Sequence, residues 1–240
     1  MSTLLLWLEA PLQSWGADSR YGNRDTLPFP TRSGVLGLLC CAAGRGGPQE
    51  VWLRRMAAYG QTVAAYARKG AFGPQRPPLL RDFQMVGSGY DAADPWQNLL
   101  TPKTIEGKKP VGNGTKMTFR NYIQDMAFAC ALDMPTEEAA VLDAALHEPV
   151  WELSLGRRNC PPADIVGRGL FADTPAALQA AENLAAERRR ERIFTVFEGA
   201  REDGDVLTLN DVPVRFGLRK VYRDRQVTVV PVAFDNRRKA

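Results

Sequence analysis

The first forty residues place an apolar strand, a polar turn and a glycine-bearing helix in immediate succession, which restricts the folds open to the chain. Residues 4–8 form an apolar run typical of a buried strand. Pro11 ends this run, and an apolar helix is expected over residues 34–43. Glycine lowers helix stability, so Gly34 and Gly37 are tolerable if the helix approaches a sheet or a ligand backbone closely. The sequence therefore predicts a helix in very close contact with a sheet or a ligand.

The start of this helix has the features of an anion site. Thr31 or Ser33 can cap free backbone N–H groups, and Arg32 adds positive charge where the helix dipole already favours an anion. The turn before the helix offers a flat ring and hydrogen-bonding groups; its tryptophan either stacks on a base or belongs to the core or a subunit contact. The candidate RNA ligands of this region are Gln13, Trp15, Thr31, Arg32, Ser33 and Gly34.

A second candidate region is the long segment 87–116, which is rich in Gly, Pro, Asn and Lys and has no lasting periodicity. Asn113-Gly114 is a tight-turn signal, and alternation over residues 116–123 predicts a hairpin that projects from the body. Cations interleaved with flat or apolar side chains suit single-stranded RNA, although a solvated loop before an ordinary strand is the alternative. The residues concerned are Lys103, Lys108, Lys109, Lys116, Met117, Phe119, Arg120 and Tyr122.

Two further arginine groups are interpreted differently. Arg157 and Arg158 follow a glycine at the end of an expected strand, where guanidinium groups suit phosphate or base-edge contacts. The alternative is an intramolecular ion pair with Asp125 or Glu152. The arginines of residues 188–192 are expected to form a solvated helix end.

Charge is unevenly distributed along the chain, whose net charge is +4. Residues 51–120 hold eleven Lys and Arg against four Asp and Glu, whereas residues 121–155 hold seven acidic residues and no basic one. This partition suits a protein that meets a polyanion with one surface and other protein with another, although solvated faces would give the same pattern.

Composition excludes several classes. The chain is 45% hydrophobic and 24% charged, which is ordinary for a globular protein. No apolar run is long enough to span a bilayer, and the N-terminus lacks the basic start of a signal peptide, so a cytoplasmic protein without membrane contact is expected. The four cysteines have no C-x-x-C spacing, so neither a zinc site, a disulfide framework nor another cofactor is indicated.

Catalysis is not expected. The single histidine, His147, lies near a helix end and is interpreted as structural. Residues 107–116 are rich in glycine and lysine but do not match the P-loop pattern, and no pair of carboxylates has acid–base spacing. The RNP1 motif of ordinary RNA-recognition domains is also absent, so an aromatic stacking platform cannot be assumed.

The order of expected elements favours an α+β class with a ferredoxin-like unit. Strand, helix, strand, strand, helix and strand follow one another over the first two thirds of the chain. Residues 1–170 are expected to form this unit, and residues 171–240 to add strands and a helix as an extension or small lobe. The expected strands are 4–8, 61–68, 81–86, 116–123, 126–132, 150–155, 193–197, 206–209 and 227–233; the helices are 34–43, 50–58, 136–146 and one from Thr174.

Three segments resemble the CasD family, a subunit of the type I-E CRISPR complex called Cascade. They are LEAPLQSWG with FPTRSGVLGLLCCAAG, then TFRNYIQDMAFACAL, then LGRRNCPPADIV, in the family's order and at similar separations. The resemblance spans most of the chain, with a general pattern only after about Phe171. It implies a modified RRM fold of the RAMP type, with a protruding thumb at about residues 87–120.

The resemblance also implies a role in antiviral defence. Members of the family hold the 5′ handle of CRISPR RNA, cap the filament of backbone subunits and contact the large subunit that reads the protospacer-adjacent motif. Target DNA is met indirectly through the complex, and base pairing by the RNA reads its sequence. Type I-E members are regarded as non-catalytic.

Two alternatives remain open on the sequence. One is a metal-independent endoribonuclease that processes CRISPR repeat RNA, with Lys116 and Tyr122 as candidate groups. The other is an assembly module whose basic loop meets acidic protein without contacting RNA.

Overall fold

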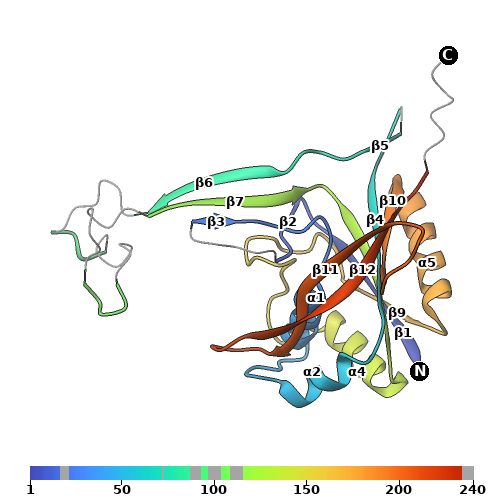
Figure 1. The fold of residues 1–240 in the computed structure, drawn as a ribbon, viewed down its shortest axis with the longest axis horizontal. Coiled ribbons are helices and arrows are strands. Elements are labelled where there is room, and N and C mark those ends of the chain that lie inside the picture. Colours follow the sequence, from blue (N-terminus) through green and yellow to red (C-terminus); the bar gives the residue numbers. More distant parts are fainter. Residues whose placement is uncertain (17–21, 72, 87–92, 97–103, 109–115, 234–240) are drawn as a thin grey trace.

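A computed structural model describes residues 1–16, 22–71, 73–86, 93–96, 104–108 and 116–233. These residues form a mixed α/β structure with mostly antiparallel sheets (Figure 1), which agrees with the expected class. The larger sheet has the strand order β11-β12-β10-β4-β8-β1-β9, with β5 paired to β4. Its strands are β1 (Ser2–Glu9), β4 (Gln61–Gly70), β5 (Gly73–Gln75), β8 (Ala127–Met134), β9 (Gly167–Phe171), β10 (Arg190–Glu198), β11 (Asp205–Arg215) and β12 (Val221–Pro231).

Helices cover both faces of this sheet, which explains the apolar run at residues 4–8. Leu4, Leu6 and Leu8 point into a core shared with the first three helices, whereas Leu5 and Trp7 pack against the alanines of the last. A strand buried on both faces needs no polar alternation. None of the described helices is long and apolar enough to cross a membrane. The helices are α1 (Arg32–Ala42), α2 (Glu50–Met56), α4 (Thr136–His147) and α5 (Thr174–Glu187).

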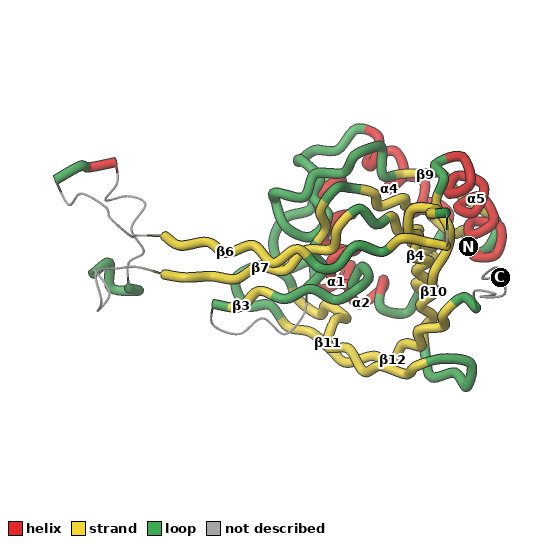
Figure 2. Tube along the Cα trace, turned by 90° about the horizontal axis from the view of Figure 1, so that it is seen from above, coloured by secondary structure: helices red, strands yellow, loops and turns green. Residues whose placement is uncertain are grey.

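A second, smaller sheet extends away from the body. β6 (Leu80–Val86) and β7 (Lys116–Gln124) form an antiparallel ribbon in which Phe83 lies opposite Phe119. β7 also pairs with the short strands β2 (Leu12–Gln13) and β3 (Asn23–Arg24). The ribbon projects far from the main sheet in both views (Figures 1 and 2).

The strand expected at residues 150–155 is not formed. The backbone of this segment instead pairs with the end of α1: the Val150 N–H donates to the Ala42 carbonyl at 2.9 Å, and the Cys41 thiol donates to the Glu152 carbonyl at 3.3 Å. Residues 149–166 therefore run as an irregular segment, and the next strand begins at Gly167. Apolar character alone did not distinguish a strand from a segment held by a helix end.

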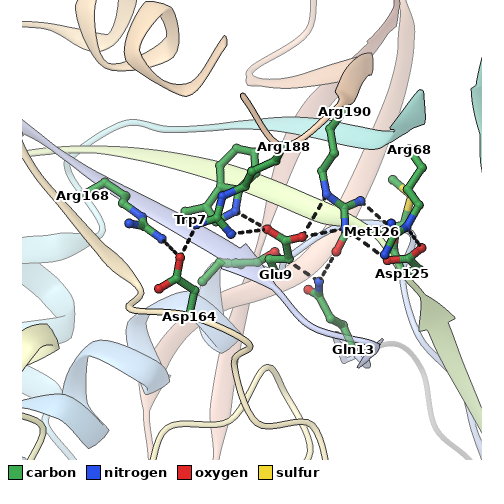
Figure 3. A network of polar contacts seen from close by, with 11 residues as sticks. Trp7, Glu9, Gln13, Arg68, Asp125, Met126, Asp164, Arg168, Arg188 and Arg190 are labelled. Carbon is green, nitrogen blue, oxygen red and sulfur yellow. Dashed lines mark hydrogen bonds and ion pairs between the residues drawn. The ribbon is translucent and has the colours of Figure 1, made fainter. Parts of the chain in front are cut away.

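Glu9, at the end of β1, is the centre of a polar network (Figure 3). Its carboxylate accepts hydrogen bonds from the Trp7 indole at 2.8 Å, from Arg188 at 2.8 Å and from Arg190 at 2.7 Å. Arg190 also reaches Asp125 at 3.1 Å, although only 5% of the residue is exposed. The expectation of a solvated helix end at residues 188–192 is therefore wrong for Arg188 and Arg190, which connect the end of α5 and the start of β10 to β1. Arg189 is exposed, as expected.

Burial and pairing act in opposite directions on the carboxylates of this network. Burial alone would raise the pKa of Glu9, but hydrogen bonds from Trp7 and Arg190 outweigh it and hold the pKa below its ordinary value. The pKa of Asp125 is lowered in the same way by Arg68 and Arg190. A carboxylate with a lowered folded pKa stabilises the fold above its unfolded pKa, and that stabilisation is lost as the pH falls through the folded pKa.

We predict that Glu9→Gln destabilises the protein by about 2–3 kcal/mol at pH 7, because it removes one of the two carboxylates paired with the buried Arg190 and also the pair with Arg188. The loss should shrink as the pH falls through the lowered pKa of folded Glu9, because the wild-type carboxylate is then protonated as well. Urea unfolding at pH 7 and pH 3.5 measures both effects. Asp203→Asn, which removes an exposed pair with Arg201, is the control and should change little; equal effects of the two variants would contradict the prediction.

Candidate nucleic-acid interface

A groove of about 580 Å³ runs along the exposed side of α1. Ser33, Gly34, Gly37 and Cys41 recur at helical spacing and form its floor. Residues 14–16 and 24–25 line it together with residues 151–157, and these segments are in contact: the Ser14 N–H donates to the Leu155 carbonyl at 3.1 Å, and Arg157 donates to the Arg24 carbonyl at 2.8 Å. The end of the β11–β12 hairpin also lines the groove. The groove thus collects side chains from the whole length of the chain. Its residues include Ser14, Trp15, Arg24, Asp25, Thr31, Ser33, Gly34, Gly37, Arg45, Trp151, Gly156, Arg157, Phe216, Lys220 and Tyr222.

The predicted cap of α1 is present. The Thr31 hydroxyl accepts a hydrogen bond from the Gly34 N–H at 3.1 Å. A side chain at Gly34 would meet the Trp15 ring at 2.9 Å, so glycine is required by a close approach to this tryptophan. Gly37 meets nothing within 4 Å and faces the open groove. The two glycines therefore have different roles. Gly34 allows the Trp15 ring to pack against α1, whereas Gly37 leaves open space in the groove.

Gln13 and Trp15 support the groove from beneath instead of presenting free groups. Both are fully buried. The Trp15 indole donates to the Gln13 amide oxygen at 3.1 Å, and the Gln13 amide donates to the carbonyls of Leu8 and Met126 at 3.1 and 2.7 Å. Their hydrogen-bonding capacity is used within the protein, so of the two alternatives for Trp15 the structure has the core position.

The anion position at the start of α1 is occupied by a protein carboxylate. The Arg32 N–H donates to Asp211 at 2.7 Å, and the Arg32 guanidinium pairs with Glu198 at 2.6 Å and donates to two main-chain carbonyls. Arg225 bridges Asp211 and Glu198, at 2.7 Å from each. The helix start does attract an anion, as predicted, but the anion comes from β11 and Arg32 points inward.

Arg157 lies beside Tyr122, so two predicted residues meet. The guanidinium stacks over the Tyr122 ring at 4.7 Å and donates to the carbonyls of Asn121 and Arg24 at 3.2 and 2.8 Å. Asp125, one of the partners considered for it, pairs with Arg68 and Arg190 instead. Arg157 therefore lines the groove with its planar face held by a ring and its edge by carbonyls.

The other predicted residues lie elsewhere. Arg158 is exposed and faces a second hollow on the far side of residues 151–158. Met117, Phe119 and Arg120 belong to the β6–β7 ribbon, where Phe119 packs on Phe83 at 5.2 Å. The structure does not describe Lys103, Lys109 or the Lys116 side chain. Lys108 is exposed and pairs with Glu106 at 3.2 Å.

The groove residues that sequence reasoning missed include two cations and an aromatic residue from distant parts of the chain. Arg24 comes from β3, and Lys220 and Tyr222 come from the connection of β11 to β12 and the start of β12. The segment 215–223 holds two aromatic residues, Phe216 and Tyr222, among four cations, a mixture similar to that of residues 116–122. This mixture of cations and aromatic residues was the available signal. The segment lies between two short expected strands, and nothing in the sequence indicated that it reaches α1.

The charges of the groove suit binding of an anionic polymer better than catalysis. Arg24, Arg157 and Lys220 contribute positive charge, whereas the lining carboxylate Asp25 is held by the Asn121 amide at 3.1 Å. Burial raises the pKa of the Cys40 thiol to about 12, so it is neutral and unreactive. A cationic surface over a glycine floor allows a phosphodiester backbone to approach closely.

The family model described as "CRISPR-associated protein (Cas_Cas5)" matches residues 3–229. The CRISPR system Cascade subunit CasD of Escherichia coli (strain K12) is 31% identical over 165 residues, which is 67% of each chain. A solved structure titled "CRISPR RNA-guided surveillance complex" contains a chain with 29% identity and a TM-score of 0.70, over 95% of this chain and 89% of that one.

We predict opposite effects of alanine at two glycines of the groove. Gly156 has φ +92°, and a Cβ there would lie 1.6 Å from the Ser14 carbonyl oxygen, so Gly156→Ala should cost about 2 kcal/mol or more. Gly37→Ala should gain about 0.5–1 kcal/mol, because the helix gains a better helix former in open space. Denaturant unfolding measures both; equal stabilities would contradict the geometry of the groove wall.

Proposed function

The chain belongs to the Cas5 family of CRISPR-associated proteins, and we propose that it is the subunit of a Cascade-type surveillance complex that holds the 5′ handle of CRISPR RNA. The observation that carries this proposal is the groove along α1. Its glycine floor and its cations, drawn from β3, residue 157 and residue 220, provide what a single RNA strand requires. In this proposal Arg24, Arg157 and Lys220 contact handle phosphates. Thr31 and Ser33 line the groove at the start of α1 and contact the same strand of RNA.

The topology supports a ferredoxin-like unit of the RAMP type. The strands β4-β8-β1-β9 lie in that order, with α1 between β1 and β4 in the chain and α4 between β8 and β9. In this reading residues 1–170 form the unit. Residues 171–240 extend it, because β10 pairs with β4 in the same sheet.

The β6–β7 ribbon is proposed as the thumb of the family. Met117 is 59% exposed and Phe83 51%, and both lie on a ribbon that projects from the body. Apolar side chains in such a position suit insertion between unstacked bases at the junction of handle and spacer. The same end of the protein would then cap the filament of backbone subunits and contact the large subunit, leaving target sequence to base pairing.

A non-catalytic role fits the described side chains. The Tyr122 ring is buried, and its hydroxyl accepts a hydrogen bond from the Asn159 amide at 3.0 Å, which weighs against Tyr122 as a general acid or base. His147 is exposed, and its ring bonds to the Asp143 carbonyl at 2.8 Å, outside the groove. Cleavage of repeat RNA in a metal chelator, lost on Lys116→Ala, would instead support the endoribonuclease alternative.

The direct test is to purify the tagged chain from cells that carry its CRISPR operon and to sequence the RNA that comes with it. Spacer RNAs that share one repeat-derived 5′ tag, together with backbone subunits, are the expected result. A complex assembled without RNA, and insensitive to salt, would overturn handle binding and leave the assembly-module alternative.

We predict that Lys220→Ala weakens binding of a 5′-handle RNA by about threefold to tenfold and lowers the salt dependence by about one phosphate contact. Arg223→Ala is the matched control, because this exposed cation of β12 lies outside the groove lining. Fluorescence anisotropy with labelled RNA at several salt concentrations measures both. Equal losses in the two variants would mean that charge, and not the groove, determines binding.

A further inference from the structure

A second hollow, of about 1110 Å³, lies on the other side of residues 151–158 from the groove. Its lining includes three exposed apolar side chains: Val150 is 63% exposed, Trp151 47% and Ile165 52%. Pro149, Pro161 and Pro162 line it as well, and we call these six residues the apolar shelf. Large apolar side chains gathered in one exposed hollow are typical of a binding surface and not of an ordinary protein exterior.

The shelf is rigid although it contains no helix or strand. The Val150 N–H donates to the Ala42 carbonyl at 2.9 Å, which attaches the first part to α1. The second part is attached to β1, because the Ala163 N–H donates to the Glu9 carbonyl at 2.7 Å and the Trp7 N–H donates to the Val166 carbonyl at 2.9 Å. Prolines restrict the backbone further. A partner would therefore meet a preformed surface and lose little entropy in ordering it.

The charge beside the shelf is negative. Of the acidic block at residues 121–155, Asp125 and Glu138 are neutralised by arginines. Glu148 and Glu152, which flank the shelf, are exposed and have no ion pair within the described part of the chain. Arg158 adds one positive charge at the edge. This arrangement repels a polyanion and attracts a cation presented next to an apolar side chain.

We infer that the apolar shelf docks a segment of a different protein chain, which inserts an apolar side chain in the hollow and places a Lys or Arg against Glu148 or Glu152. A second copy of this chain does not fit, because a two-fold contact would oppose the same carboxylates. RNA does not fit either, because Glu148 and Glu152 would repel its phosphates. The inference goes beyond handle binding, and of the six shelf residues only Trp151 also lines the groove.

Photocrosslinking in the assembled complex tests the inference. Benzoylphenylalanine replaces Ile165 in the tagged chain, the complex is purified from cells that carry the whole operon, and irradiated adducts are identified by mass spectrometry. We expect an adduct with one other polypeptide, at an apolar residue within a few positions of a Lys or Arg. The same probe at Val206, which is 45% exposed on β11, controls for random capture. Adducts with RNA, with a second copy, or with no polypeptide above the control would overturn the inference.

A charge variant supplies an independent readout. Glu152→Lys should lower the fraction of complexes that retain the crosslinked subunit several-fold, and a reciprocal Lys or Arg to Glu change in that subunit should restore it. Glu187→Lys, at an exposed position of α5, is the matched control. Binding of handle RNA by the Glu152→Lys chain should be unchanged, which separates this result from any failure of the handle proposal. Full retention of every subunit by Glu152→Lys would overturn the inference.

Discussion

A cluster of four charged side chains between α1 and the last three strands determines whether the groove exists. Arg32 starts α1, Glu198 ends β10, Asp211 lies in β11 and Arg225 in β12. Two cations and two carboxylates balance within hydrogen-bond distance, which offsets the cost of taking charge out of water. Because the cluster is largely buried, it fixes the β11–β12 hairpin over α1 and brings Lys220 to the helix face. Without it the groove would lose one side.

The residues that carry the family resemblance form the framework of the site more than its surface. Glu9 holds Arg188 and Arg190, Gln13 holds the Trp15 ring, and that ring determines that position 34 is glycine. The motif thus describes how the first strand, the turn and α1 are joined. Of the cations proposed to meet RNA, Arg157 lies in one of these motifs, whereas Arg24 and Lys220 come from other parts of the chain, where the sequence is less distinctive.

Local signals predicted the elements well, and long-range pairing accounts for most of what they missed. The apolar run at residues 4–8 and the capped helix from residue 32 follow from periodicity and capping, which act over a few residues. The inward orientation of the Arg32 side chain depends on Glu198, 166 positions away, and that of Arg190 on Glu9, 181 positions away. Residue type indicates that an arginine needs an anion, but it does not indicate whether that anion is a phosphate or a distant carboxylate.

One short segment relates the two proposed binding surfaces. Arg157 and Arg158 are neighbours, yet one lines the groove and the other the hollow that contains the apolar shelf. Gly156 makes this possible, since its positive φ allows the chain to turn while touching the Ser14 carbonyl. Main-chain hydrogen bonds to α1 and β1 hold the segment on both sides. A strand of RNA in the groove and a protein segment on the shelf would therefore be positioned by the same rigid wall, which fixes their separation without a conformational change.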